Sequence, residues 1–270
     1  MVPTSICHNK MGMNKMKIGV IGAGNMGTAM IKGWIKAGQN NIAVMNPENP
    51  RVTAFCDKYH LPLFHNADEM IDWQPDVLMF TTPAKVTLEV VKQFAGIDND
   101  AILVSAAAGV RLNQLEDALP NHSWTRIIPN IPVEVNAGTI GMTFGQHMNE
   151  TTHQIVSLMK LLGDVIPVSE DQLNIVGTIG GCGSAFIDVI MDALSDAAVK
   201  HGLDREKAYQ LVSSMVAGTG KLALESKLSP STLRDQVTSP GGTTIRGVQA
   251  LEKHGVRFAM MDAVDEASEN

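Results

Sequence analysis

A glycine-rich loop near the start of the chain carries the clearest chemical signal, because its glycines follow the spacing G-x-G-x-x-G. An apolar run at 17–21 precedes the loop, and a helical pattern follows it. In a strand-turn-helix unit, Gly22 permits the tight turn, Gly24 lets the backbone approach a pyrophosphate, and Gly27 lets helix and strand pack closely. The loop therefore predicts a Rossmann-type dinucleotide site formed by Gly22, Ala23, Gly24, Asn25, Met26 and Gly27.

The residue expected beside the adenosine ribose is Asn46, which ends the second predicted strand. An Asp at this position would bond both ribose hydroxyls and repel a 2′-phosphate, whereas Asn accepts either cofactor. Pro47 offers nothing to a phosphate, although Arg51 follows within reach of one. The pattern leaves NADPH and NADH both open and slightly favours NADPH, because the acidic discriminator is absent.

Two further loops follow predicted strands at the carboxyl edge, where parallel sheets of this kind bind ligands. Small residues there would let a nicotinamide ribose lie against the backbone, and ordinary tight turns explain each loop almost as well. The expected cofactor contacts in these loops are Thr81, Thr82, Pro83, Ala107, Ala108 and Gly109.

A second candidate anion site lies near the other end of the chain, in the Ser-Pro-Gly-Gly-Thr-Thr stretch at 239–244. Two glycines allow successive N–H groups to converge beside a helix start, with hydroxyl groups next to them. Since the first loop already serves a pyrophosphate, a second cradle favours an acidic substrate, most economically a small carboxylate. A helix start without a ligand is an equally good physical explanation. The candidate residues are Ser239, Gly241, Gly242, Thr243 and Thr244.

The elements that must position these loops alternate between apolar runs and helical patterns, as in a parallel sheet covered by helices. The predicted strands are 17–21, 41–45, 76–81, 101–106, 125–129 and 138–144. The predicted helices around them are 25–37, 51–59, 85–94, 112–118 and 150–162. This order predicts an α/β fold in which residues 16–168 form an N-terminal Rossmann domain.

From residue 169 onward helical patterns replace strand signals, so we expect 169–270 to form an all-helical domain. Ser169 with Gln172 forms a capping box, and Asp204 and Ser229 cap later helices, the last with Pro230 at its first position. The helix at 184–200 is apolar on most faces and should be buried all round. One subunit offers too few partners for this surface, which predicts a dimer core; packing on the Rossmann domain alone is the alternative.

Composition narrows the range of partners. The 270 residues are 44% hydrophobic and carry a formal net charge of −7 without a basic tract, so we expect no nucleic acid partner. Three distant cysteines fit a reducing cytoplasm, and the eight histidines show no zinc signature, so we expect no metal. The sequence has no uncharged apolar stretch of about 18 residues, so we expect no helix to span a membrane. Residues 1–15 lack the apolar run of a secretory signal and are expected to be a disordered extension.

The stretch 234–255 closely resembles the signature of the pyrroline-5-carboxylate reductase family, which completes proline biosynthesis. The resemblance covers nearly the whole chain from Met16, including the loop at 22–27, Asn66, and the segments 107–109, 126–132 and 180–186. It implies hydride transfer from NAD(P)H to a cyclic imine carboxylate, with Asn66 among the cofactor contacts. It also implies interlocked homodimers, in many members assembled further, with a site formed between domains across the dimer.

The same resemblance implies that Gly242, Thr243 and Thr244 hold the substrate carboxylate and that the Thr244 hydroxyl faces the ring nitrogen as the catalytic group. A protonated cyclic imine is already electrophilic at carbon 5, so the enzyme's main task is to position it, and no strong base is required. Thr244 would orient the iminium or relay a proton.

The chain departs from the family pattern at several places near the expected site. Thr82 replaces a usual Lys, Ile131 a usual Thr, and Pro47 a usual Arg, while the segment 180–186 lacks several hydroxyl groups. These departures leave two alternatives open: a divergent paralogue that reduces another cyclic imine, and a non-catalytic NAD(P)-binding regulatory protein. The intact stretch at 239–244 argues against the second, because a dinucleotide sensor has no need of a carboxylate site.

Overall fold

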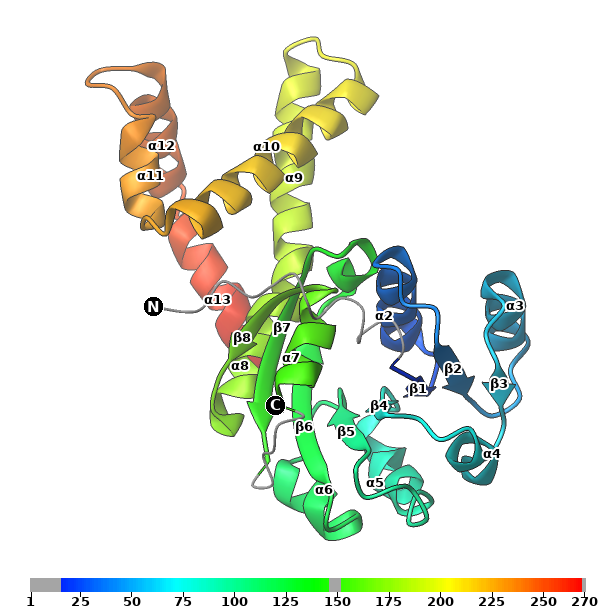
Figure 1. The fold of residues 1–270 in the computed structure, drawn as a ribbon. Helices are drawn as coiled ribbons and strands as arrows, with labels where there is room; N and C mark the ends of the chain where they lie inside the picture. Colours follow the sequence, from blue (N-terminus) through cyan, green and yellow to red (C-terminus); the bar gives the residue numbers. More distant parts are fainter. Residues whose placement is uncertain (1–15, 146–151, 269–270) are drawn as a thin grey trace. The chain divides into compact units, whose positions relative to one another are not determined.

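The computed structural model describes residues 16–145 and 152–268 (Figure 1). The expected extension at 1–15 and the start of the helix expected at 150–162 lie outside the described residues. Contacts divide the chain into two compact units, Met1–Gly181 and Cys182–Asn270, which we call the Rossmann unit and the helical unit. Each unit is described by itself.

The Rossmann unit contains an eight-stranded sheet with the order β3-β2-β1-β4-β5-β6-β7-β8. Strands β1 to β6 run parallel, β7 runs antiparallel to β6, and β8 runs parallel to β7. The order of the first six strands is that of a dinucleotide-binding sheet, and it reverses direction between β1 and β4. The strands are β1 Ile18–Ile21, β2 Ile42–Met45, β3 Leu63–Phe64, β4 Val77–Phe80, β5 Ile102–Ser105, β6 Ser123–Pro129, β7 Gly138–Phe144 and β8 Gly163–Pro167.

Helices cover both faces of this sheet, which is why β1, β2, β4 and β5 are buried at every position. On one face, α2 (Asn25–Lys36), α3 (Pro50–Tyr59) and α7 (Thr152–Lys160) share a core with alternate strand residues. Helix α2 contributes Met30 and Trp34 to this core. On the other face, α4 (Ala67–Asp72), α5 (Ala84–Lys92) and α6 (Leu112–Ala118) enclose a second core that includes Phe80 and Phe94.

Each predicted strand matches an observed one, but the strands β3 and β8 and the α-helix between β3 and β4 were not predicted. Strand β3 has only two residues, both half-buried at the edge of the sheet, so it leaves no readable pattern. The helix α4 that follows it is also short. Strand β8 pairs only with β7, and its mixed exposure hides it in the sequence.

The segment after β8 begins with the expected cap, since Ser169 and Gln172 form a capping box around the 3₁₀ helix η2 (Glu170–Gln172). Helix α8 (Leu173–Gly177) then packs on β6 and β7 with Leu173 fully buried. A π-helical turn, η3 (Thr178–Cys182), follows α8. The contacts therefore divide at residue 181, while the change from strand to helical pattern in the sequence falls at 168/169.

The helical unit consists of five helices among the described residues: α9 Gly183–Lys200, α10 Arg205–Ser226, α11 Pro230–Gln236, α12 Thr243–Lys253 and α13 Val256–Ser268. The predicted caps are confirmed. The Asp204 carboxylate accepts from the backbone N–H groups of Glu206 and Lys207, and the Ser229 hydroxyl accepts from that of Thr232. Helix α10 packs along α9.

The helix at 184–200 is largely exposed in the single chain, and its burial in a dimer core stays a prediction. Ser195 is its only buried residue, and Val189 is 71% exposed. The apolar side chains of Leu224 on α10 and Phe258 on α13 are likewise 65% and 70% exposed. Such a surface is far more apolar than solvent contact favours.

Among the described residues, one helical run, Glu170–Lys200, is long and apolar enough to cross a membrane when judged by length and composition alone.

Candidate dinucleotide and anion sites

The glycine loop joins β1 to α2 at the point where the strand order reverses. Gly22 has a φ of +93°, a conformation that favours glycine, and its N–H donates to the Met45 carbonyl at 2.8 Å. The Thr81 hydroxyl donates to the Gly22 carbonyl, which ties the loop after β1 to the loop after β4. A Cβ on Gly27 would overlap the Gly22 carbonyl oxygen and lie 2.7 Å from Thr81 Oγ1. Only glycine fits where α2 starts against this turn.

Open space lies above the same loop. Gly24 is the N-cap of α2 without a side-chain capping bond, and a Cβ built on it would meet nothing within 4 Å. Both Gly24 and Asn25 are exposed. The first N–H groups of α2 are therefore presented to an uncrowded position, which fits the pyrophosphate of a dinucleotide.

Asn46 follows β2 and holds the glycine loop through its side chain. Its Oδ1 accepts from the Ala23 N–H at 3.0 Å, and its Nδ2 donates to the Pro47 carbonyl at 2.7 Å. The Arg51 guanidinium lies on the same loop, donating to Asn25 Oδ1 at 3.2 Å and to the Ala23 carbonyl at 3.3 Å. The structure thus brings Arg51 to the loop, where the sequence indicated only that it was within a few positions.

The loops after β4 and β5 lie at the same carboxyl edge, because β4 runs parallel beside β1 and β5 runs parallel beside β4. The Thr82 hydroxyl is 2.9 Å from that of the buried Thr87, so it stabilises its own turn. In the loop after β5, Ala107 is buried, whereas Ala108 and Gly109 are exposed, the latter with a φ of +83°.

Asn66 lies after the edge strand β3, and β2 stands between that strand and β1. Its Oδ1 accepts from the Glu69 N–H at 3.0 Å and caps α4. The side-chain oxygen is therefore used in local structure, while the amide nitrogen remains for a ligand.

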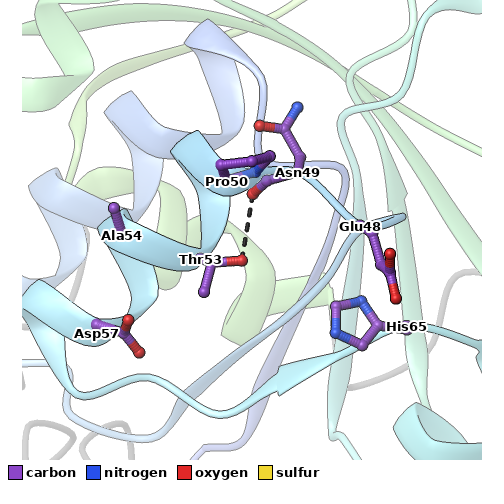
Figure 2. Close-up of a pocket in the computed structure, with 7 residues that line it drawn as sticks. All are labelled: Glu48, Asn49, Pro50, Thr53, Ala54, Asp57 and His65. Carbon is purple, nitrogen blue, oxygen red and sulfur yellow. Dashed lines mark hydrogen bonds between the residues drawn. The ribbon is translucent and has the colours of Figure 1, made fainter.

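An open hollow beside α3 is lined by none of the predicted cofactor residues, although its lining residue His65 has Nδ1 3.0 Å from the Asn46 carbonyl oxygen (Figure 2). The helix contributes one face, seen from Pro50 to Asp57, and the Thr53 hydroxyl is bonded to the Asn49 carbonyl. The residues that line it are Glu48, Asn49, Pro50, Thr53, Ala54, Asp57 and His65.

The second glycine loop, in the helical unit, forms a turn that starts α12. The Gly242 N–H donates to the Ser239 carbonyl at 3.0 Å, and Gly241 has a φ of +69°. Gly242 is the N-cap of α12 without a side-chain capping bond, and Thr243 and Thr244 are exposed in the first turn. The arrangement leaves N–H groups and hydroxyl groups together at one helix start, which fits a small anion.

A cation missed in the sequence supports this second loop. Arg246 Nη1 donates to the Gly241 carbonyl at 2.9 Å. Its position, two residues beyond Thr244 in the same helical turn, is the signal that would have revealed it. The charge adds to the positive potential at the start of α12.

An ion pair is formed by Arg126, a buried residue in the middle of β6. Arg126, only 3% exposed, donates to Glu170 Oε1 at 2.6 Å, and the same oxygen accepts from the Leu112 N–H at 2.6 Å. Nearby, buried Asn130 donates to the Gly180 carbonyl at 2.9 Å and accepts from the Thr139 N–H at 2.8 Å. These bonds hold β6, α6 and the residues after β8 in one frame.

Comparison with known proteins identifies the family. The family model described as pyrroline-5-carboxylate reductase dimerisation matches residues 170–270, and one described as NADP oxidoreductase, coenzyme F420-dependent, matches residues 17–109. The pyrroline-5-carboxylate reductase of Methanosarcina acetivorans is 34% identical over 95% of this chain and 97% of its own length. The chain belongs to the pyrroline-5-carboxylate reductase family.

Other family members agree in sequence and in fold. The pyrroline-5-carboxylate reductase of Escherichia coli is 33% identical over 94% of this chain and 96% of its own. The solved structure of the Coxiella burnetii reductase matches with a TM-score of 0.81 at 30% identity, over 94% and 96% of the two chains. A Plasmodium falciparum pyrroline carboxylate reductase solved with NADP bound also gives a TM-score of 0.81, at 25% identity over 96% and 97%. The predicted α/β class, with an N-terminal Rossmann domain and a helical dimerisation domain, is confirmed.

The places where this chain departs from the family pattern can now be located. Thr82 is bonded within its own turn, and Ile131, at the start of the 3₁₀ helix η1 (Ile131–Val135), is 51% exposed. Cys182 is exposed at the end of the π-helical turn. None of these residues interrupts either glycine loop.

Proposed function

We propose that this chain reduces 1-pyrroline-5-carboxylate to L-proline with NAD(P)H, the final step of proline biosynthesis. The observation that carries the proposal is a pair of open helix starts, one per unit, each preceded by a glycine loop and free of side-chain caps. Membership of the pyrroline-5-carboxylate reductase family supplies the substrate class.

In this proposal the Rossmann unit holds the dinucleotide. The loop at 22–27 takes the pyrophosphate at the start of α2, Asn46 marks the adenosine ribose, and the loops after β4 and β5 face the nicotinamide half. When bound, the reduced nicotinamide supplies the hydride. NADPH is favoured, supported by the NADP held in the solved Plasmodium relative. The proposed contacts are Gly22, Ala23, Gly24, Asn25, Met26, Gly27, Asn46, Asn66, Thr81, Thr82, Pro83, Ala107, Ala108 and Gly109.

The helical unit holds the substrate. Gly242, Thr243 and Thr244 bind the carboxylate, together with the Ser239 hydroxyl and the backbone of Gly241. The free donors are the N–H groups of Thr243 and Thr244, because the Gly242 N–H is bonded to the Ser239 carbonyl. The Thr244 hydroxyl orients the ring nitrogen. Because the protonated imine is already electrophilic, placement and charge complementarity are the contributions required of these residues.

The proposal also includes the association of two copies of the chain. The apolar surfaces of α9, α10 and α13 belong to residues that match the dimerisation model, so we propose that a second copy covers them. The run Glu170–Lys200 then serves as a homodimer core rather than a membrane span, and Asp188, Asp192 and Asp196 interrupt its apolar surface. We expect a cytoplasmic homodimer, which can assemble further.

The test is oxidation of NADPH and NADH by the purified full chain with 1-pyrroline-5-carboxylate, followed by identification of L-proline. The control substrate is the six-membered cyclic imine carboxylate, assayed under the same conditions. Turnover with the five-membered ring supports the proposal. Turnover with only the six-membered ring, or cofactor binding without turnover on either, contradicts it.

A further inference from the structure

The guanidinium of Arg51 lies between the glycine loop and the end of β2. Arg51 is the second residue of α3, and its side chain reaches back to Asn25 Oδ1 at 3.2 Å and to the Ala23 carbonyl at 3.3 Å. The Ala23 N–H in turn donates to Asn46 Oδ1. One cation is thus held beside both the pyrophosphate loop and the residue that marks the ribose.

The charge of Arg51 is not neutralised by the protein. Both acceptors are neutral oxygens, and among the described residues no carboxylate lies within ion-pair distance of it. By contrast, Arg126 and Arg205 are each paired with a carboxylate. Arg51 is also exposed, and a guanidinium has five N–H donors, so donors remain for an anionic ligand.

At the end of β2 the side chain of Asn46 is engaged within the protein. The Asn46 oxygen is taken by the Ala23 N–H, and its amide nitrogen points to the Pro47 carbonyl. Glu48, the nearest acid in sequence, lines the hollow beside α3 together with His65 (Figure 2). Arg51 is not among the residues that line that hollow. A cation without a competing acceptor favours a phosphorylated ribose.

We propose that Arg51 selects a dinucleotide that carries a 2′-phosphate, an inference that rests on the proposed dinucleotide role of the loop at 22–27. In this fold the adenosine ribose lies at the end of the second strand, and a nearby Arg accommodates the 2′-phosphate. Arg51 occupies that place from the start of α3. Its planar fork pairs with phosphate oxygens through charge-assisted bonds.

The experiment is calorimetric binding of 2′,5′-ADP, 5′-ADP, NADPH and NADH to the wild-type full chain and to Arg51→Ala. We expect the variant to bind 2′,5′-ADP and NADPH roughly ten- to a hundredfold more weakly, and 5′-ADP and NADH within about twofold of wild type. Asn49 caps α3 through the backbone N–H of Arg51, which the substitution leaves in place.

Two further variants separate the charge from its position. Lys58→Ala removes the same charge from the last turn of α3 and should leave all four affinities unchanged. Arg51→Lys keeps a charge without the fork and should retain part of the preference. Equal weakening of all four ligands by Arg51→Ala, or equal wild-type affinity for 2′,5′-ADP and 5′-ADP, would overturn the proposal. Failure of the wild type to bind any of the four contradicts the dinucleotide site itself, and so the proposed function.

Discussion

The two glycine loops resemble each other, but the units that carry them differ. In the Rossmann unit the loop rests on strands that are buried at every position and on two cores. In the described part of the helical unit only Ser195, Ala208 and Val212 are buried. One glycine loop is therefore supported by a buried core within its own unit. The other is carried by helices whose exposed apolar surface requires a second copy of the chain to cover it.

The largest expected effect comes from disrupting the glycine loop of the Rossmann unit. In Gly27→Val the new Cβ overlaps the Gly22 carbonyl oxygen, and backbone cannot yield as a flexible side chain does. We expect a loss of about 1–3 kcal/mol in the free energy of unfolding and no measurable NADPH binding. Denaturant titration and fluorescence binding check both.

Gly96→Ala is the matched control, because a Cβ there would meet only Ile71 Cδ1 at 3.9 Å. It should keep wild-type stability and binding. Wild-type NADPH affinity in Gly27→Val would refute the close packing of α2 against the loop.

The next largest effect comes from placing a charge on the apolar surface of the helical unit. Val189→Asp places a carboxylate on the apolar surface of α9, where 71% of Val189 is exposed in one chain. Burying that unpaired charge in a dimer core costs several kcal/mol, so we expect a monomer. Light scattering after gel filtration measures the mass. Val86→Asp, at an exposed apolar position of α5 in the Rossmann unit, should leave the dimer intact. An unchanged mass for Val189→Asp would place the interface elsewhere.

Sequence pattern was sufficient where a local rule fixes the structure. Strands buried on both faces appear as continuous apolar runs, and the caps Asp204 and Ser229 follow from side-chain chemistry at helix starts. Strand β3 was not predicted because it is too short, and strand β8 was not predicted because it is exposed on part of its length. These two depend on tertiary pairing rather than on their own pattern.

In the candidate sites, too, the features set by a local rule were predicted and those set by tertiary contacts were not. Glycine spacing located both loops, since a positive φ at Gly22 and Gly241 is a local requirement. The bonds that Arg51 makes across the loop depend on how α3 lies against α2, which no spacing rule specifies. Capping of α4 by Asn66 likewise required the unpredicted helix.

The smallest expected effect concerns a thiol in the interior of the Rossmann unit. Burial, with a smaller contribution from the charge of Asp57, raises the pKa of Cys56 from 9.0 to about 11. The unfolded thiol therefore loses its proton first as pH rises. Its contribution to stability is complete below pH 9.0 and is lost as the pH approaches 11.

Urea unfolding of the wild type and of Cys56→Ala across that pH range isolates this contribution. The stability difference between the two should be constant below pH 9.0 and shrink between 9.0 and about 11. A difference that does not change with pH would mean that Cys56 titrates alike in both states.

The central claim is that one glycine loop binds the cofactor and the other binds the substrate. It is tested most directly by comparing Gly24→Val with Thr244→Ala, measuring for each variant the NADPH affinity and kcat/KM for 1-pyrroline-5-carboxylate. Gly24→Val fills the open space above the first loop and should weaken NADPH binding at least tenfold, on the order expected for lost charge-assisted bonds. Thr244→Ala should leave NADPH affinity within about twofold and lower kcat/KM roughly ten- to a hundredfold. Wild-type kcat/KM in Thr244→Ala, or NADPH binding weakened as much as in Gly24→Val, would contradict separate sites for cofactor and substrate.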